Sequence, residues 1–228
     1  MTKKTTHQER LHEQDEYRVK TKRLLALKLI NPITYKFNAG AFTLVNVLFD
    51  KARRYKRLCS SIRECHKCAG LNLHGITESA PGWGNLNADI FFVGQSLCTD
   101  CMATQMPFTK GSGYYLDAVL TASNLLRKDV FITNVVHCHP LNNRVSTPSE
   151  LDNCCAYLRE ELDIVQPKLI VAMGNSAKIV MSRLDLDIKG EVVKCKHPAS
   201  FLYSNSKGVI DWVVSLSMRI DQCLKTIY

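Results

Sequence analysis

The stretch Phe131–Cys154, FITNVVHCHPLNNRVSTPSELDNC, indicates both the fold of the chain and the place of its functional site. It begins within Val130–Val136, a β-branched and aromatic run that predicts a buried strand. Asn134 and Cys138 fall at the carboxyl end of this run, and Cys154 follows after a polar loop that contains two prolines. Open α/β sheets place their sites outside the carboxyl ends of their strands. We therefore expect a site at this end of the strand.

Apolar runs on either side of this stretch alternate with segments of helical periodicity. The runs predict further strands at Asp89–Val93, Lys168–Met173 and Glu191–Lys196. The helical segments are Gly113–Leu126, Ser149–Val165, Asn175–Leu184 and Ile210–Ile227. The second of these helices is introduced by Thr147, Pro148 and Glu150, the cap, proline and early acid that are typical of a helix start. Strands alternating with helices predict an α/β fold with a parallel, doubly wound sheet of four strands.

The first part of the chain has a different character. Met1–Arg23 is rich in charge and poor in large apolar residues, which predicts a mobile tail or a solvated helix. Apolar periodicity over Ala41–Leu58 predicts a helix, and it ends in the basic cluster Lys51–Arg57 with Tyr55 inside it. Such a cluster either contacts phosphates or is a solvated helix face. We divide the chain into a basic, partly helical extension over 1–58 and a globular domain over 59–228.

Composition narrows the partners and the compartment. The chain has 228 residues, a hydrophobic content of 46% and a formal net charge of +9, which favours an anionic partner such as nucleic acid. The amino-terminal residues are polar, and no apolar run approaches the ~20 residues that cross a bilayer. We expect a protein that is not secreted and contacts no membrane, located in the cytoplasm and associated with DNA. Its ten cysteines would then be reduced, which suggests metal binding.

Four cysteines form the strongest constellation in the sequence. Cys65 and Cys68 are a CxxC pair, which binds one metal site from a single turn, and Cys138 and Cys154 add two thiolates from separate segments. Spacing alone leaves zinc, a four-iron cluster and plain buried cysteines open. Cys155 competes with Cys154 as the fourth ligand.

A second CxxC pair, Cys98 and Cys101 in CTDC, stands apart from these four. This pair could bind a second metal or act as a redox pair. Coincidence is the third interpretation, because the sequence offers only two ligands here.

Five segments, in order, resemble the iron–sulfur uracil-DNA glycosylases, the thermophile-type branch that comprises families 4 and 5. They are CHKC at Cys65–Cys68, IFFVGQ at Ile90–Gln95, MPFTKGSG at Met106–Gly113, the opening stretch with its TNVV, PLNNR and following Pro, Glu and Cys, and KHPAS at Lys196–Ser200. The resemblance covers roughly residues 60–205. It implies a three-layer α/β/α fold around a central four-stranded parallel sheet. It also favours a [4Fe-4S] cluster on Cys65, Cys68, Cys138 and Cys154 over zinc, and assigns that cluster a structural role.

The resemblance also assigns roles at a site for a flipped base. Asn134 would pair with the uracil edge, Phe108 would stack on the base, and His197 would hydrogen-bond uracil O2 as negative charge develops there. Gly94 and Gln95 would contribute to the same site. From sequence alone, a capped strand end for Asn134 and a core aromatic for Phe108 are the favoured roles, and the ordered five-segment match reverses that preference. Other residues are candidates for contacts with DNA: Lys110, Ser112, Arg144, Lys196 and Ser200 at phosphates, and Phe201, Leu202 or Tyr203 as a wedge in the groove.

The chain departs from the family's first motif, which reads Gly-Glu-x-Pro-Gly followed by acidic residues. Here Gly94–Cys101 reads GQSLCTDC, so Gln95 replaces the glutamate and Asp100 is the only carboxylate. We expect slow excision supported by His197 and Asn134, with a water positioned by Gln95, Ser96 or Asp100.

The expected function is hydrolysis of the N-glycosidic bond of uracil, or of a related altered pyrimidine, in DNA. The alternative is a glycosylase-fold DNA-binding protein that has little or no turnover and acts as a replication or repair partner. We expect a monomer whose extension contacts replication or repair proteins. A further alternative is altered chemistry in which the CTDC thiols lie at the mouth of the site.

Overall fold

The computed structural model describes residues 39–184, 190–202 and 206–227. The chain separates into two compact units, Met1–Arg53 and Arg54–Tyr228. Helix α2, Ala39–Arg63, includes the division. In the first unit the structure describes only the start of α2, where Arg53 pairs with Asp50 at 2.8 Å. Residues 1–38 of the predicted extension, including Met1–Arg23, lie outside the described residues.

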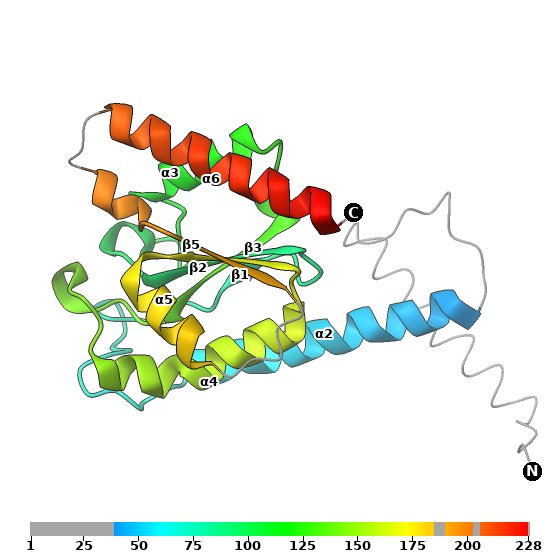
Figure 1. Ribbon diagram of the computed structural model, residues 1–228. Helices are drawn as coiled ribbons and strands as arrows, with labels where there is room; N and C mark the ends of the chain where they lie inside the picture. Colours follow the sequence, from blue (N-terminus) through cyan, green and yellow to red (C-terminus); the bar gives the residue numbers. More distant parts are fainter. Residues whose placement is uncertain (1–38, 185–189, 203–205, 228) are drawn as a thin grey trace, which may run out of the picture. The chain divides into compact units, whose positions relative to one another are not determined.

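The second unit is built on a five-stranded sheet of order β1-β3-β2-β4-β5 (Figure 1). Its strands are β1 (Trp83–Gly84), β2 (Ile90–Ser96), β3 (Val130–Val136), β4 (Leu169–Met173) and β5 (Glu191–Cys195). The four longer strands are parallel, and every residue of β3 and β4 is buried, as a sheet covered on both faces requires. The predicted four-stranded parallel sheet is therefore confirmed. The short strand β1 adds an antiparallel edge next to β3.

Helices cover both faces of this sheet (Figure 1). On one face α3 (Gly113–Ala122) and α6 (Ser206–Ile227) pack on a core that includes Phe92 and Ile132. On the other face α4 (Pro148–Val165) and α5 (Gly174–Arg183) pack on a core that includes Phe91 and Phe131. Alternate residues of each strand point to opposite faces, so the all-apolar strands supply both cores. The layers are those of the predicted three-layer α/β/α fold.

The last turns of α2 are anchored within the second unit. Leu58 and Ile62 form a small apolar cluster with Ile164 of α4. The ring of Tyr55 packs edge-on against Phe131, with ring centroids 5.6 Å apart, and its hydroxyl donates a hydrogen bond to the Gly82 carbonyl. Tyr55, in the middle of the basic cluster, is thus a packing residue. The charged neighbours Lys56 and Arg57 are exposed.

Most predicted element boundaries agree with the structure to within a few residues, and the exceptions have local causes. Helix α3 ends at Ala122 instead of Leu126, because Asn124 adopts a left-handed conformation with φ of 53° and the Leu125 N–H turns back to the Leu120 carbonyl. Helix α4 begins at Pro148, and Thr147 caps it by accepting a hydrogen bond from the Glu150 N–H.

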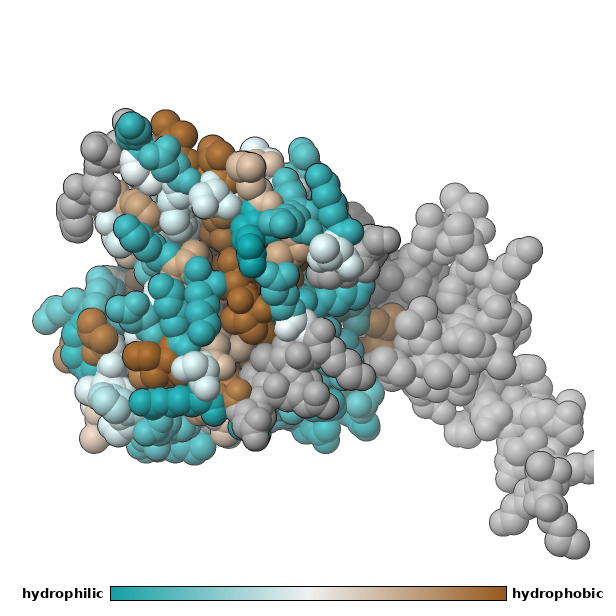
Figure 2. Space-filling view, viewed as in Figure 1, coloured by the Kyte–Doolittle hydropathy of each residue, from teal (hydrophilic) through white to brown (hydrophobic). Residues whose placement is uncertain are grey.

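Two surface features complete the description. A groove of about 930 Å³ lies between β5 and α6, and Figure 2 shows apolar residues gathered in that part of the face. None of the groove's lining residues belongs to the predicted base site. Among the described residues, no helix is long and apolar enough to cross a membrane.

Candidate active site and metal centre

Asn134 lies near the carboxyl end of β3, in register with Gly94 of β2. Its side chain is buried, with 1% of the residue exposed, and within the described part of the chain its Oδ1 has no hydrogen-bond partner. A buried polar atom without a partner costs about 1–3 kcal/mol. This oxygen is therefore poised to accept a hydrogen bond from a ligand.

Gly94 brings Asn134 and Phe108 close together. A Cβ on Gly94 would lie 2.5 Å from Phe108 Cζ and 2.7 Å from Asn134 Oδ1, closer than such atoms approach. Any larger residue would therefore displace one of the two side chains. Phe108 itself has a φ of 58°, an unfavourable conformation for a residue with a side chain, so the surrounding structure must hold it.

Two residues that the sequence analysis did not identify hold the Phe108 segment. Trp83 of β1 donates a hydrogen bond from Nε1 to the Pro107 carbonyl at 2.8 Å. Arg127 donates from Nη2 to the Phe108 carbonyl at 2.6 Å, while its Nε lies 2.5 Å from Asp117. The base-stacking candidate is thus fixed through its backbone by contacts that are distant in sequence.

His197 stands at the start of the short helix η4, Pro198–Phe201, next to Phe108 with ring centroids 5.6 Å apart. Gly174, at the start of α5, makes room for it, because a Cβ there would lie 2.9 Å from His197 Cβ. The Ala199 N–H donates to Nδ1 of His197 at 3.1 Å, and burial lowers the pKa of the imidazole to about 4. At neutral pH the ring is therefore uncharged with its proton on Nε2, which makes that nitrogen a donor.

The altered first motif continues from β2 into the loop that follows it. Gln95 donates from Nε2 to the Arg144 carbonyl at 3.3 Å and to Ser96 Oγ at 3.4 Å, and its Oε1 accepts from Ser176 at 3.2 Å. Gln95 thus links the loop after β3 to the start of α5. The carboxylate of Asp100 lies beside Gly111, 3.0 Å from the position of a Cβ there. Asp100 is thereby placed against the MPFTKGSG segment.

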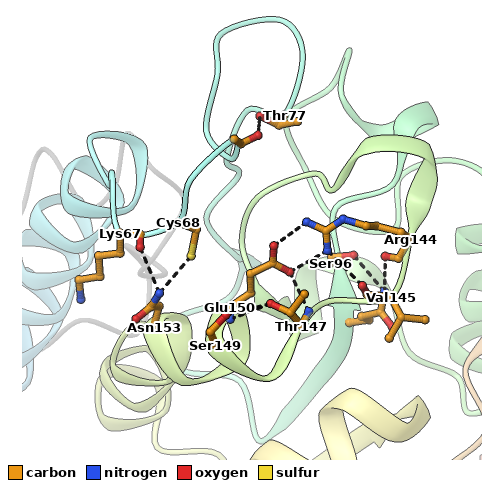
Figure 3. A network of polar contacts seen from close by, with 12 residues as sticks. Lys67, Cys68, Thr77, Ser96, Arg144, Val145, Thr147, Ser149, Glu150 and Asn153 are labelled. Atoms are coloured by element: carbon orange, nitrogen blue, oxygen red, sulfur yellow. Dashed lines mark hydrogen bonds and ion pairs between the residues drawn. The ribbon is translucent and has the colours of Figure 1, made fainter.

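The candidate DNA contacts differ in exposure. Lys110, Lys196 and Ser200 are exposed, and Ser112 is half-buried. Arg144 is engaged in a two-point ion pair with Glu150, with Nη2–Oε1 at 2.6 Å and Nη1–Oε2 at 2.9 Å (Figure 3). This pair lowers the pKa of Glu150 and fixes the loop that precedes α4.

The three wedge candidates also differ. Phe201 is 8% exposed and packs on Trp212 in the core, with ring centroids 5.4 Å apart. Leu202 is 45% exposed, and Tyr203 lies outside the described residues. Of the two that the structure describes, only Leu202 presents its side chain to solvent.

The four predicted cysteine ligands come together. Cys65, Cys68, Cys138 and Cys154 line one pocket with Lys67, Leu71, Asn72 and Asn153, and Cys155 is not among the lining residues. Burial raises the pKa of Cys138 to about 12, and negative charge on the other three thiols adds to the effect. A group of thiols that oppose one another's ionisation requires a cationic centre to be held as thiolates. Among the described residues, no three His, Cys, Asp or Glu side chains are arranged to hold a single metal ion.

Polar residues brace this cysteine site. Asn153 of α4 donates from Nδ2 to the Lys67 carbonyl at 3.1 Å and to Cys68 Sγ at 3.4 Å (Figure 3). Asn72 donates to the Cys65 carbonyl at 2.8 Å and accepts from the Ser79 N–H. These bonds hold the CxxC segment against the rest of the domain.

A fully buried ion pair lies behind Cys154. His137 Nε2 lies 3.3 Å from Glu161 Oε1, and Glu161 also accepts a hydrogen bond from the Gly82 N–H at 3.0 Å. Burial favours the neutral imidazole, but Glu161 and Cys154 outweigh it and raise the pKa of His137. Burial likewise opposes ionisation of Cys154, and the hydrogen bond from His137 overcomes it and lowers the thiol's pKa. This pair was not predicted from the sequence, although a histidine directly before a candidate ligand, just after a buried strand, is a signal for it.

Comparisons with known proteins agree with this geometry. The family model described as the Uracil DNA glycosylase superfamily matches residues 81–217. Proteins named "Type-4 uracil-DNA glycosylase" are similar to the chain. The one from Archaeoglobus fulgidus is 35% identical over 62% of this chain and 81% of its own length. The one from Thermotoga maritima is 39% identical over 49% of this chain and 58% of its own length. The one from Pyrobaculum aerophilum is 33% identical over 60% of this chain and 72% of its own length. Because this family model matches residues 81–217 and the Archaeoglobus fulgidus protein is similar over most of its own length, we conclude that the chain belongs to the uracil-DNA glycosylase superfamily.

Proposed function

We propose that the protein removes uracil, or a related altered pyrimidine, from DNA by hydrolysing its N-glycosidic bond. The observation that carries the proposal is His197: a neutral imidazole with its proton on Nε2, packed beside Phe108. Membership of the superfamily and the names of the relatives support the same activity.

His197 would act on the leaving group. Breaking the N-glycosidic bond leaves negative charge on the base and positive charge on the sugar. A donor aimed at uracil O2 stabilises this transition state more than the ground state, because the charge on the oxygen grows as the bond breaks. Since the ring is neutral before the reaction, it stabilises the anionic base as a hydrogen-bond donor instead of as a cation.

Asn134 and Phe108 would select and hold the base. The unpartnered Oδ1 of Asn134 can accept the N3–H of uracil while Nδ2 donates to O4. Cytosine presents an acceptor at N3 and a donor at its amino group. Its N3 would therefore face Oδ1, acceptor against acceptor, and its amino group would face Nδ2, donor against donor. Phe108 would stack on the flipped base, which must leave the helix to reach this site.

The altered motif would assist hydrolysis only modestly. Gln95 and Ser96 do not ionise near neutral pH, so neither removes a proton from the attacking water before the bond breaks. A dissociative reaction tolerates this, because a water positioned by Gln95, Ser96 or Asp100 needs only to trap the sugar cation. The expected result is excision slowed relative to a motif with a carboxylate at position 95.

The exposed basic and polar residues would place the DNA. Lys110, Lys196 and Ser200 flank the residues of the base site in sequence and are suited to phosphate contacts. Leu202 is the described residue best suited to fill the gap left by the flipped base.

We also propose that Cys65, Cys68, Cys138 and Cys154 hold a [4Fe-4S] cluster. Four thiols on three separate segments line one pocket, which supplies the four thiolate ligands that such a cluster would take. When bound, the cluster would supply positive charge and a cross-link between the segment before β1 and the loop after β3. Protein purified anaerobically should absorb near 400 nm and lose that band in Cys138→Ser; a colourless protein containing zinc would contradict the assignment.

The remaining assignments concern partners and location. The net charge of +9 supports a DNA-associated protein, and we propose that it acts as a monomer in the cytoplasm, with its basic extension contacting replication or repair proteins.

The decisive experiment is excision from a uracil-containing oligonucleotide, single- and double-stranded, scored as alkali-sensitive abasic sites. We expect excision by the natural protein, loss in Asn134→Ala and no change in Asn175→Ala, an exposed asparagine on α5. Salt-dependent DNA binding without excision would favour the alternative function, a DNA-binding protein without turnover.

A further inference from the structure

The second CxxC pair lies beside the base site and has no part in the function proposed above. Cys98 precedes the short helix η1, Thr99–Cys101, so the two cysteines sit on one turn. Their Sγ atoms are 2.9 Å apart. Cys98 is half-exposed, whereas Cys101 is fully buried with Leu97 and Ala80. Cys98 is therefore the more accessible of the two cysteines, and its sulfur is in contact with that of Cys101.

The surroundings of Cys101 stabilise a thiolate. The hydrogen bond from Cys98 has the largest effect; burial opposes it, and the backbone of Lys110 and the hydroxyl and backbone of Thr109 add to it. Together they lower the pKa of Cys101 to about 5, while the same bond raises the pKa of Cys98. At neutral pH the pair thus carries one negative charge and shares one proton.

The pair is better suited to redox chemistry than to metal binding. Among the residues described, no third His, Cys, Asp or Glu joins it in a group that could hold a metal ion. Thr99, between the two cysteines, is held by Asn143, whose Oδ1 accepts from the Thr99 N–H at 3.0 Å. The turn is therefore fixed with its sulfur atoms already in contact, so little rearrangement is needed to join them.

We propose that Cys98 and Cys101 are a redox-active dithiol that is oxidised reversibly to a disulfide by low-molecular-weight disulfides. Cys98 is the nucleophile because it is the more exposed of the two cysteines, although Cys101 is the one that ionises first. The proton of Cys98 passes to Cys101 across the contact between the two sulfur atoms, and Cys98 Sγ attacks one sulfur of the reagent RSSR, which places a mixed disulfide on Cys98 and releases RS⁻. Cys101 then attacks Cys98 Sγ, giving up the proton to the second leaving group as RSH. In sum, one thiol, one thiolate and RSSR become a protein disulfide, RS⁻ and RSH, and two electrons pass to the reagent.

Oxidation also changes a contact of the segment that carries Phe108. Cys101 Sγ lies 3.8 Å from the carbonyl oxygen of Lys110, two residues after Phe108. Joining Cys101 to Cys98 changes the position and the charge of this sulfur, so the segment that holds Phe108 in its left-handed conformation loses a contact. We expect oxidation to slow excision several-fold. This consequence rests on the proposed function, whereas the disulfide itself does not.

Peptide mapping tests the disulfide directly. Full-length protein with its metal centre intact is equilibrated anaerobically with varied ratios of oxidised to reduced glutathione, alkylated and cut before aspartate. Cleavage at Asp100 separates Asp89–Thr99, which contains Cys98, from Asp100–Leu116, which contains Cys101. We expect the two peptides to become joined in most molecules as the ratio rises and to separate again with reductant. Both cysteines alkylated at every ratio, or glutathione retained on Cys98 without closure, would overturn the proposal.

Trp83 reports the effect on the site without any measurement of excision. Its Nε1 bonds to the Pro107 carbonyl, and Trp212 is the only other tryptophan. In a Trp212→Phe background we expect oxidation to shift Trp83 emission, with the shift absent in Cys98→Ser and retained in Cys59→Ser. An unchanged emission in fully oxidised protein would remove the link to Phe108. If emission shifts but no form of the protein excises uracil, the proposed function fails and the redox site stands.

Discussion

The base site and the cysteine site begin on the same strand, yet they satisfy their polar groups in opposite ways. Asn134 of β3 keeps a buried oxygen without a partner in the described structure, and Gly94 lies between it and Phe108, which packs beside His197. Four residues later, Cys138 enters a site where Asn153 and Asn72 bond to the segments that carry the thiols, and the His137–Glu161 pair supports Cys154. A site that binds a ligand transiently keeps a polar atom without a partner until the ligand arrives. A site for a permanently bound group instead has its ligand-bearing segments held by hydrogen bonds from neighbouring residues.

The largest loss of stability is expected from the buried ion pair that supports the cysteine site. Glu161→Ala removes the carboxylate opposite His137 and leaves a buried charge without its partner, which costs about 3–5 kcal/mol of unfolding free energy. Urea unfolding under anaerobic conditions measures this. The neighbouring exposed residue provides the control, and Glu160→Ala should change stability by less than about 0.5 kcal/mol. Equal losses in the two variants would show that the buried pair does not stabilise the cysteine site.

The base site should show the reverse behaviour, a loss of rate with little loss of stability. His197→Ala removes the donor to the departing base and should lower the single-turnover excision rate by about 10²–10³-fold, as removal of an oxyanion donor does in other enzymes. Its unfolding midpoint and DNA affinity should stay close to those of the natural protein. His74→Ala, at an exposed histidine, serves as the control. Full activity in His197→Ala would remove the proposed role of this residue.

The pH dependence of excision tests the electrostatics of the same residue. Burial lowers the pKa of His197 from 6.5 to about 4, so the neutral donor persists until the pH approaches 4. In the unfolded chain the ring binds its proton near pH 6.5, so this residue's contribution to stability is complete above that pH. It declines as pH falls toward 4, because there the unfolded state binds more protons. The excision rate should show no loss attributable to His197 between pH 8 and about 5. A loss with a midpoint near 6.5 that disappears in His197→Gln would show that the imidazole is solvated.

The smallest effect is expected at the rim of the cysteine site. Asn153→Ala removes the bonds to the Lys67 carbonyl and to Cys68 and should cost about 1 kcal/mol. We expect the absorbance band near 400 nm to bleach a few-fold faster in the presence of a chelator. Asp152→Ala, at an exposed neighbour on the same helix, should bleach at the natural rate. Identical bleaching rates in the two variants would show that the hydrogen bonds of Asn153 do not hold the cysteine site together.

The sequence was sufficient for features that depend on local pattern. Predominantly apolar runs bounded by polar loops predicted three of the four parallel strands, and Val130–Val136 agrees residue for residue with β3. The fourth, β5 (Glu191–Cys195), carries two charged residues and was predicted from the alternation of strands and helices. Cys65, Cys68, Cys138 and Cys154, which the family resemblance selected, line one pocket, and Cys155 is not among its lining residues. Their role as metal ligands remains a prediction. The roles assigned to Asn134, Phe108 and His197 remain predictions, although the structure places their side chains in one series of contacts.

Other features depend on contacts between distant segments, which leave no local signal. Trp83 and Arg127 act through the backbone of the Phe108 segment, and nothing in their own surroundings in sequence points to it. Strand β1 is two residues long, too short for any periodicity. The burial of Phe201 follows from the approach of Trp212 on α6, whereas its position in KHPASF suggested exposure.

Strand β3 also has a kinetic consequence. Every one of its residues is buried, and the strand pairs with β2 along its length and with β1 at Phe131 and Ile132. Amide protons bound to these neighbours exchange with solvent only when the sheet itself opens. The residue that would read the base and the strand that leads to Cys138 therefore belong to one cooperative unit. Local opening of the surrounding loops would therefore leave their spacing unchanged as long as the sheet stays closed.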